Sequence, residues 1–150
     1  MNSNVALSTQ QRTDVITAFL RHAGKILLLQ RSDKVGSYRG RWAGVSGYLE
    51  NATPLAQALR EIREETGLGA DEVHLVARAA PLEVKAPALC KVWVVHAFLF
   101  DVDRQTVRLD WESAQYQWID PRYLGDYTTV PMLAEALKAC LDRERQQAEQ

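Results

Sequence analysis

The spacing of apolar residues changes several times along this chain, and the order of these changes constrains the fold more than any single motif does. Runs of β-branched and aliphatic residues predict strands at residues 14–20, 25–30, 73–79, 91–102 and 115–119. Residues 21–24 separate the first two runs as a hairpin turn. Helical spacing follows Thr53 and returns over residues 132–143, with Pro131 in the first turn.

Strands in this order mostly follow strands, without the strict strand–helix alternation of a parallel sheet. This order predicts an α+β fold, a sandwich with a mixed sheet and helices packed on it. A chain of 150 residues fits one domain. We expect that domain over residues 13–143, between a flexible N-terminal segment at 1–12 and a C-terminal tail at 144–150.

Composition excludes several classes of protein. The 18 basic and 19 acidic residues leave a net charge of −1, which argues against a protein that coats a nucleic-acid duplex. No apolar run is long enough to cross a membrane, and the first residues lack the pattern of a secretory signal. Cys90 and Cys140 match no zinc or redox spacing, so we expect both to be buried as small apolar residues in a reduced, cytoplasmic setting.

The segment between Gly47 and Leu68 carries the strongest local signals. Thr53 is a good helix N-cap, Pro54 suits the first helical position, and Gly67 is a typical C-cap. One arc of this helix is apolar and should pack on the sheet; it consists of Leu55, Ala58, Leu59 and Ile62.

Three glutamates occupy the neighbouring arc of the same helix. Glu61, Glu64 and Glu65 are spaced so that their carboxylates repel one another, near a helix end that disfavours negative charge. Mg²⁺ prefers clustered carboxylate oxygens, and such an ion would remove the repulsion. The alternative interpretation is a glutamate-rich helix face that is merely solvated.

The run REIREETGL from Arg60 to Leu68 resembles the second half of the signature of the Nudix hydrolases at every specified position. Gly47 is similar to the glycine of the loop that precedes this run in the family. Glu50 fits a glutamate commonly found three residues after that glycine. The resemblance implies the Nudix fold, an α/β/α sandwich around a central mixed sheet.

The resemblance continues outside this run and covers roughly residues 15–119. The segment 27–31, LLLQR, is similar to the family's second strand with its terminal arginine. Trp42 resembles the aromatic residue before the glycine loop. Glu112 lies six residues before Trp118, where some members place another metal-binding glutamate.

The chain also departs from the family pattern in the loop between Gly47 and Arg60, which is one residue short. Residues 51–54, NATP, stand where Gly-Glu-Thr-Pro is common, so the expected loop glutamate is missing. The usual Pro-Gly-Gly is replaced by residues 45–47, VSG. These changes alter the loop and leave the glutamates of the helix intact.

The resemblance implies hydrolysis, dependent on Mg²⁺ or Mn²⁺, of a diphosphate linked to another group. It assigns Glu64 and Glu65 as the main metal ligands and Glu61 as a ligand or base. Glu112 would be a further ligand or general base on a loop that can close over the phosphates. Arg60 would orient a ligand, and without the loop glutamate we expect it to pair with Glu64 at i+4 rather than with the loop.

The substrate would be a small-molecule phosphoanhydride, and we expect no membrane or nucleic-acid duplex as a partner. The resemblance is compatible with either a monomer or a homodimer. Four residues are expected to contact the substrate: Arg31, Arg41, Trp42 and Gly47, whose missing side chain lets the backbone approach the metal and phosphates. Nucleoside triphosphates, nucleotide sugars and dinucleotides are not separated by the sequence, because loops such as 34–41 and 82–89 make that choice. A rival interpretation is a module that keeps the fold and binds a nucleotide without turnover.

Overall fold

The computed structural model describes residues 10–149, and the part of the expected flexible segment at residues 1–9 lies outside this range. The strands are β1 (Gln11–His22), β2 (Lys25–Arg31), β3 (Trp42–Ala43), β4 (Val45–Tyr48), β5 (Val73–Arg78), β6 (Leu82–Ala86), β7 (Lys91–Val102) and β8 (Ser113–Ile119). The helices are α2 (Pro54–Thr66) and α3 (Leu133–Ala148), with short 3₁₀ turns η1 (Ala70–Glu72), η2 (Pro87–Leu89) and η3 (Pro121–Asp126).

β1 lies at the centre of one mixed sheet. It pairs in parallel with β7 along almost its whole length, from Gln11 opposite Lys91 to Arg21 opposite Asp101. It also pairs antiparallel with β2 and β4. On one side of the sheet, β8 pairs with β2; on the other side, β5 and β6 both pair with β7. The mixed sheet that the strand order predicted is therefore confirmed.

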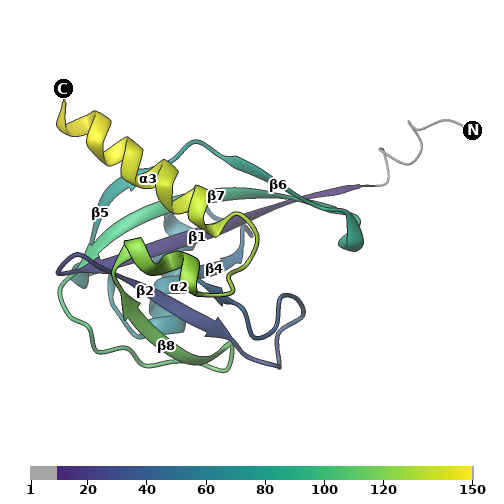
Figure 1. Ribbon diagram of the computed structural model, residues 1–150, viewed down its shortest axis with the longest axis horizontal. Coiled ribbons are helices and arrows are strands. Elements are labelled where there is room, and N and C mark those ends of the chain that lie inside the picture. Colours follow the sequence, from purple (N-terminus) through teal and green to yellow (C-terminus); the bar gives the residue numbers. More distant parts are fainter. Residues whose placement is uncertain (1–9, 150) are drawn as a thin grey trace, which may run out of the picture.

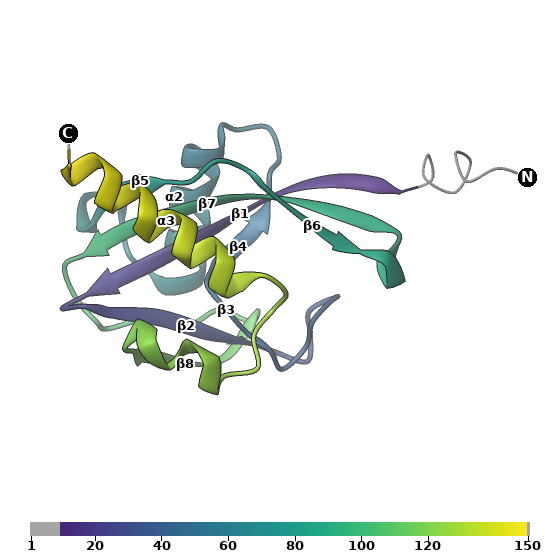
Figure 2. The ribbon, with the colours of Figure 1, turned by 45° about the horizontal axis from the view of Figure 1, so that its top comes forward.

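The two helices cover opposite faces of this sheet (Figures 1 and 2). Along β1, Ile16, Ala18 and Leu20 point into the core beneath α2, whereas Phe19 points into the core beneath α3. The predicted apolar arc of α2 packs in the first core, where Ala58 and Ile62 are fully buried and Leu55 and Leu59 are partly buried. The α+β sandwich is thus confirmed.

One segment expected to be a loop is a strand. Residues 82–86 form β6 and pair with β7, so the expectation of a loop over 82–89 is wrong for most of its length. Their sequence, LEVKA, alternates apolar and charged residues with the period of a half-buried strand. The signal was short, and Pro81 and Pro87 on either side favoured a loop interpretation.

The two cysteines differ in environment. Cys140 is fully buried in the core beneath α3, as expected, but Cys90 is exposed where η2 turns into β7. Cys90 has φ = 52°, in the left-handed region, because the chain reverses there between β6 and β7. The expected burial of Cys90 was therefore wrong.

Regular secondary structure begins before residue 13 and continues past residue 143. β1 begins at Gln11, and α3 continues to Ala148. An ion-pair network holds the later part of α3 to the sheet, because Arg21 of β1 contacts Asp101 of β7 at 2.7 Å and Glu144 of α3 at 2.8 Å. No helix in the described range combines the length and apolar character needed to cross a membrane.

Candidate functional site

Helix α2 begins and ends where its sequence predicts. The Thr53 hydroxyl accepts a hydrogen bond from the Ala56 backbone N–H at 3.2 Å, and Pro54 occupies the first turn. At the other end Gly67 adopts φ = 80°, and its N–H donates to the Arg63 carbonyl. Both caps satisfy backbone groups that a helix end leaves without partners, so the helix that carries the glutamates has fixed ends.

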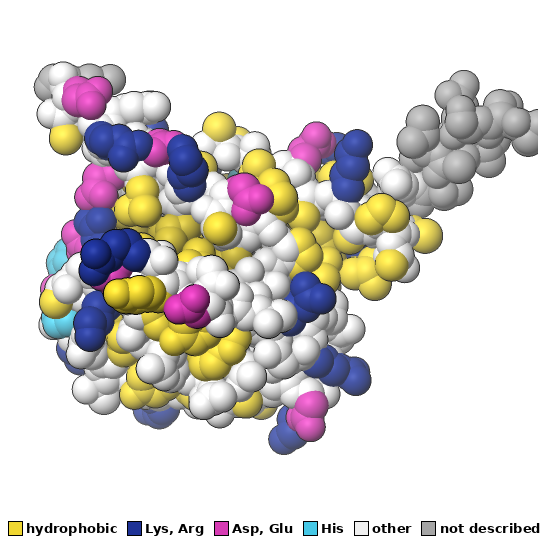
Figure 3. Space-filling model, viewed as in Figure 1, with side chains coloured by type: hydrophobic (Ala, Val, Ile, Leu, Met, Phe, Trp, Pro, Cys, Tyr) yellow, Lys and Arg dark blue, Asp and Glu magenta, His cyan; other side chains and the backbone are white. Residues whose placement is uncertain are grey.

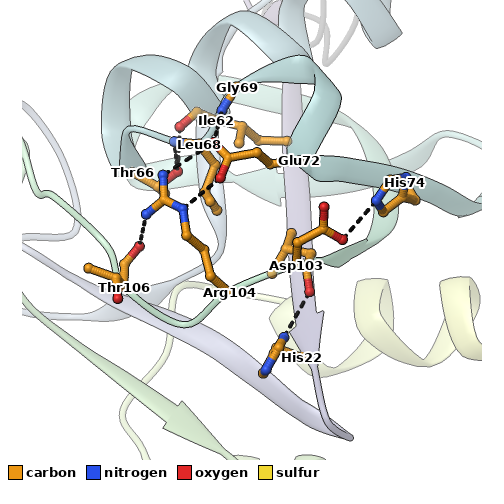
Figure 4. Close-up of polar contacts among 11 residues, drawn as sticks. His22, Ile62, Thr66, Leu68, Gly69, Glu72, His74, Asp103, Arg104 and Thr106 are labelled. Atoms are coloured by element: carbon orange, nitrogen blue, oxygen red, sulfur yellow. Dashed lines mark hydrogen bonds and ion pairs between the residues drawn. The ribbon is translucent and has the colours of Figure 1, made fainter.

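Polar contacts then anchor the C-terminal end of α2 to the rest of the fold (Figure 4). The Thr66 hydroxyl donates to the Ile62 carbonyl at 2.6 Å. After the helix, Glu72 accepts hydrogen bonds from the Gly69 N–H and from the Arg104 guanidinium, which lowers the pKa of Glu72 to about 2. The segment that follows β7 is thereby tied to the end of α2, next to Glu64 and Glu65.

Glu61 is a largely buried carboxylate, only 8% exposed. Its Oε1 accepts a hydrogen bond of 3.0 Å from the side-chain amide of Gln57. A Cβ added at Gly47 of β4 would overlap the Glu61 carboxyl, so any larger residue at this position would displace that carboxyl. The group that lies close to the Gly47 backbone is the Glu61 side chain. Burial raises the pKa of Glu61.

Glu65 is buried more deeply, at 3% exposure, and its Oε2 has no hydrogen-bond partner. Its carboxyl lies within hydrogen-bonding reach of Glu61. Burial, this contact and the nearby charge of Glu112 raise the pKa of Glu65 well above its usual range. A buried carboxylate oxygen without a donor is costly in a folded protein and requires an explanation.

Glu64 lies on the exposed side of the cluster. The Arg60 Nε donates to its Oε1 at 3.1 Å, which confirms the contact predicted one turn apart on the helix. The Arg60 guanidinium also lies 3.9 Å from the Glu50 carboxylate in the loop before the helix. Arg60 therefore spans the shortened loop and the glutamate face of α2.

Glu112 reaches the same region from the turn before β8. Burial, followed by the charges of Asp110 and Glu61, raises the pKa of Glu112 to about 7. Its N–H donates to the Asp110 carboxylate at 3.0 Å, and its carbonyl accepts from the Ser32 N–H at 2.8 Å. The turn is thus anchored on both sides.

Asp110 is a site residue that the sequence analysis missed. It affects Glu112 and Glu65 by charge, and it fixes the backbone of the turn. An aspartate whose side chain accepts from the N–H two residues later is a common local turn. That pattern was visible in the sequence, but the proximity of Asp110 to α2 depends on the tertiary fold.

The glutamate face of α2 opens into a pocket of about 390 Å³. The charged residues of its lining are Arg31, Glu50, Arg60, Glu61, Glu64 and Glu112. Aromatic and aliphatic side chains line the rest, including Tyr38, Tyr48, Trp93, Trp111, Leu82 and Val84. Figure 3 shows hydrophobic side chains gathered between α3 and the β6–β7 ribbon, with most charged side chains toward the edges of the view.

Two of the expected substrate contacts do not line this pocket. Trp42 packs edge to face on Tyr127, with ring centroids 5.4 Å apart, on the α3 side of the sheet. Arg41 lies over the Tyr38 ring, and its guanidinium is 3.4 Å from the Thr129 carbonyl. β3 carries Trp42 toward Tyr127, and the substrate contacts expected of Trp42 and Arg41 stay predictions. Arg31 and Gly47 do line the pocket.

Within residues 10–149, no three His, Cys, Asp or Glu side chains converge at the spacing of metal ligands. Their partners explain this arrangement, because Arg60 holds Glu64 and Gln57 holds Glu61. The donor set nevertheless suits a hard cation, since it consists of carboxylate oxygens. The unpartnered Oε2 of Glu65 fits the same interpretation, because a bound cation would supply the missing partner.

The buried carboxylates predict an unusual pH dependence of stability. The folded protein holds the Glu112 proton more tightly than the unfolded chain does, because folding raises its pKa from 4.5 to about 7. The free energy of unfolding of the metal-free protein should therefore fall as the pH rises through this window. Thermal unfolding in EDTA should show that the Tm of the wild type falls by several degrees as the pH rises from 4.5 to about 7. The fall in Tm should be smaller in Glu112→Gln, and in Asp33→Asn it should equal that of the wild type. An equal fall in all three proteins would contradict this prediction.

Comparisons with known proteins agree with the fold. The model of the NUDIX domain matches residues 10–140. The MutT protein of Methanosarcina mazei has a similar structure, with a TM-score of 0.69 and 20% identity over 94% of this chain and 98% of that one.

Two further solved structures are similar to this chain. The NUDIX domain of Shewanella oneidensis NrtR, solved with ADP ribose, has a TM-score of 0.72 and 13% identity over 95% of this chain and 99% of that one. The Ap4A hydrolase of C. elegans has a TM-score of 0.66 and 18% identity over 86% of this chain and 93% of that one. At these identities the structures show a shared fold, and the family match over most of the chain shows that this protein belongs to the Nudix family.

Proposed function

We propose that this protein is a pyrophosphohydrolase that depends on Mg²⁺ or Mn²⁺ and cleaves a diphosphate linked to another group. The observation that carries the proposal is the buried Glu65 carboxylate with its unpartnered Oε2, beside Glu61 and within the field of Glu112. A fold selected only for stability has no use for such a group, because burying it costs free energy. As a ligand of a divalent cation, the buried Glu65 carboxylate would have a function that offsets this cost.

Under this proposal, different residues of the site would bind the cation, accept a proton and bind phosphate. Glu61, Glu64 and Glu65 would hold the cation, which when bound neutralises phosphate oxygens and lowers the pKa of water. Glu112 would take a proton, because a pKa of about 7 allows a carboxyl to accept and release one near neutral pH. Arg31 lies at the same end of the pocket, with its Nε donating to the Ser37 carbonyl at 2.9 Å, and would bind phosphate.

The pocket supports a substrate with one charged and one flat or apolar part. Its polar end can take a diphosphate, and its aromatic walls can take a base or a similar ring. We therefore propose a nucleoside diphosphate linked to a further moiety, such as a nucleotide, a nucleotide sugar or a related compound. The ADP ribose in the NrtR domain is compatible with this class.

The rival function is nucleotide binding without turnover. The shortened loop favours it, because the loop lacks the family's usual glutamate. A binder without activity would be free to lose carboxylates, yet Glu61, Glu64 and Glu65 are all present and the first and last are buried. We therefore favour the enzyme. Release of a phosphate-containing product from a panel of nucleotide substrates with Mg²⁺ distinguishes the two functions.

Glu65→Gln tests the cation site. It removes a buried charge, so the metal-free variant should unfold at the same or a higher temperature than the wild type. Mg²⁺ should raise the Tm of the wild type more than that of the variant, because only the native site gains the ion. Turnover should fall by at least about a hundredfold. The control Glu135→Gln lies on α3 and should match the wild type. An active Glu65→Gln with a normal Mg²⁺ response would contradict the assignment.

Glu112→Gln tests the proton acceptor. The amide keeps the size of the side chain but cannot take a proton, so kcat should fall by about tenfold to a thousandfold with a smaller change in KM. Steady-state kinetics at saturating Mg²⁺ measure both constants. A variant with the kcat of the wild type would show that Glu112 is only a structural residue of the turn.

Arg60→Ala tests whether Arg60 orients Glu64. Loss of the contact should raise the Mg²⁺ concentration for half-maximal activity by about tenfold to a hundredfold. Stability should change little, because both side chains are largely exposed. Arg63→Ala, on the exposed side of the same helix, provides the matched control. An unchanged half-saturation concentration in Arg60→Ala would exclude the role.

A further inference from the structure

A buried glutamine lies beneath the glutamate cluster. Gln57 is 1% exposed and belongs to α2, one turn before Glu61. Its Nε2 donates to Glu61 Oε1 at 3.0 Å, and its Oε1 accepts from the Glu50 backbone N–H at 3.4 Å. The side chain thus joins the loop after β4 to a carboxylate of the proposed cation site.

This arrangement uses both ends of the Gln57 amide. A buried amide costs free energy unless its donor and acceptor find partners, and here each end has one. The orientation is fixed by those partners, because the reverse one would place a carbonyl oxygen against the Glu61 carboxylate. Gln57 therefore presents a donor to Glu61 in a defined direction.

Glu61 is held from two sides as a result. The Gln57 amide fixes Oε1, and the backbone of Gly47 packs against the same carboxyl. Gln57 is uncharged, so it orients Glu61 without neutralising it as an arginine or lysine would. The charge of Glu61 stays available for a cation, whereas Glu64 already pairs with Arg60.

We propose that Gln57 is a positioning residue that sets the orientation in which Glu61 binds the divalent cation. It also ties the shortened loop to α2 at Glu50, in a loop that lacks the family's usual glutamate. This inference rests on the proposed function, because it requires Glu61 to be a cation ligand. It adds a residue outside the signature positions to the determinants of cation affinity.

Cation binding without substrate tests the proposal. Gln57→Met preserves the length of the side chain in a residue that suits helices and tolerates burial, and it removes the donor. Gln57→Ala removes the donor and leaves space instead of a new contact. Both variants should weaken Mn²⁺ binding by about tenfold to a hundredfold, as measured by calorimetry or by the paramagnetic resonance of free Mn²⁺.

A matched control separates positioning from loss of stability. Leu59→Ala lies on the same helix and removes packing against the core beneath α2 without touching a carboxylate. It should lower Tm in EDTA while its Mn²⁺ affinity stays within about twofold of the wild type. Activity provides a second readout: raising Mg²⁺ should restore kcat in Gln57→Met toward the wild-type value, because Glu61 itself is still present.

The outcomes distinguish this proposal from the proposed function. If Glu65→Gln loses Mn²⁺ binding while both Gln57 variants match Leu59→Ala, the cation site stands and the role of Gln57 is refuted. If the wild type binds no Mn²⁺ at millimolar concentration, the proposed function fails and the role of Gln57 fails with it. Weakened binding in both Gln57 variants, with unchanged binding in Leu59→Ala, supports the proposal.

Discussion

The burial of the Glu65 carboxylate next to Glu61 is the constraint on which the rest of the site depends. Burial removes these two carboxylates from water, which costs free energy when they are charged, and the charges of nearby carboxylates add to this cost. Protonation relieves part of this cost in the metal-free protein, which is why the pKa values of both groups are raised. A divalent cation would offset this free-energy cost at neutral pH while leaving the carboxylates charged. The same carboxylate oxygens would then determine both the stability of the fold and the proposed function.

The scaffold keeps these charged groups in place by fixing both ends of α2 and the turn that faces it. Thr53 and Gly67 cap the helix, and the Arg104–Glu72 pair anchors the chain just after it. Asp110 holds the turn that carries Glu112. Each of these contacts is made within the fold and needs no ligand, so the helix and the turn that carry the glutamates are fixed on one side of the mixed sheet.

The sequence predicted the parts of this structure that local physics determines. The bounds of α2, its apolar arc and the Arg60–Glu64 contact follow from caps and helical spacing, which act over a few residues. The resemblance to the Nudix signature correctly identified the family. The strand β6 was missed because five alternating residues between prolines give a weak signal.

Features that depend on tertiary contacts were missed or misplaced. Asp110 affects the glutamates only because the fold brings its turn to α2. Gln57 lies one helical turn from Glu61, but its burial and its contact with the Glu50 N–H depend on the fold. Sequence spacing also could not show the environment of Trp42, which packs on Tyr127 because β3 pairs with β2. The central claim is that the unpartnered Oε2 of Glu65 is a cation ligand. Anomalous diffraction from crystals grown with Mn²⁺ tests it most directly: we expect an ion about 2.0–2.2 Å from Glu65 Oε2, whereas an ion bound only elsewhere, with Oε2 still unpartnered, would contradict the account.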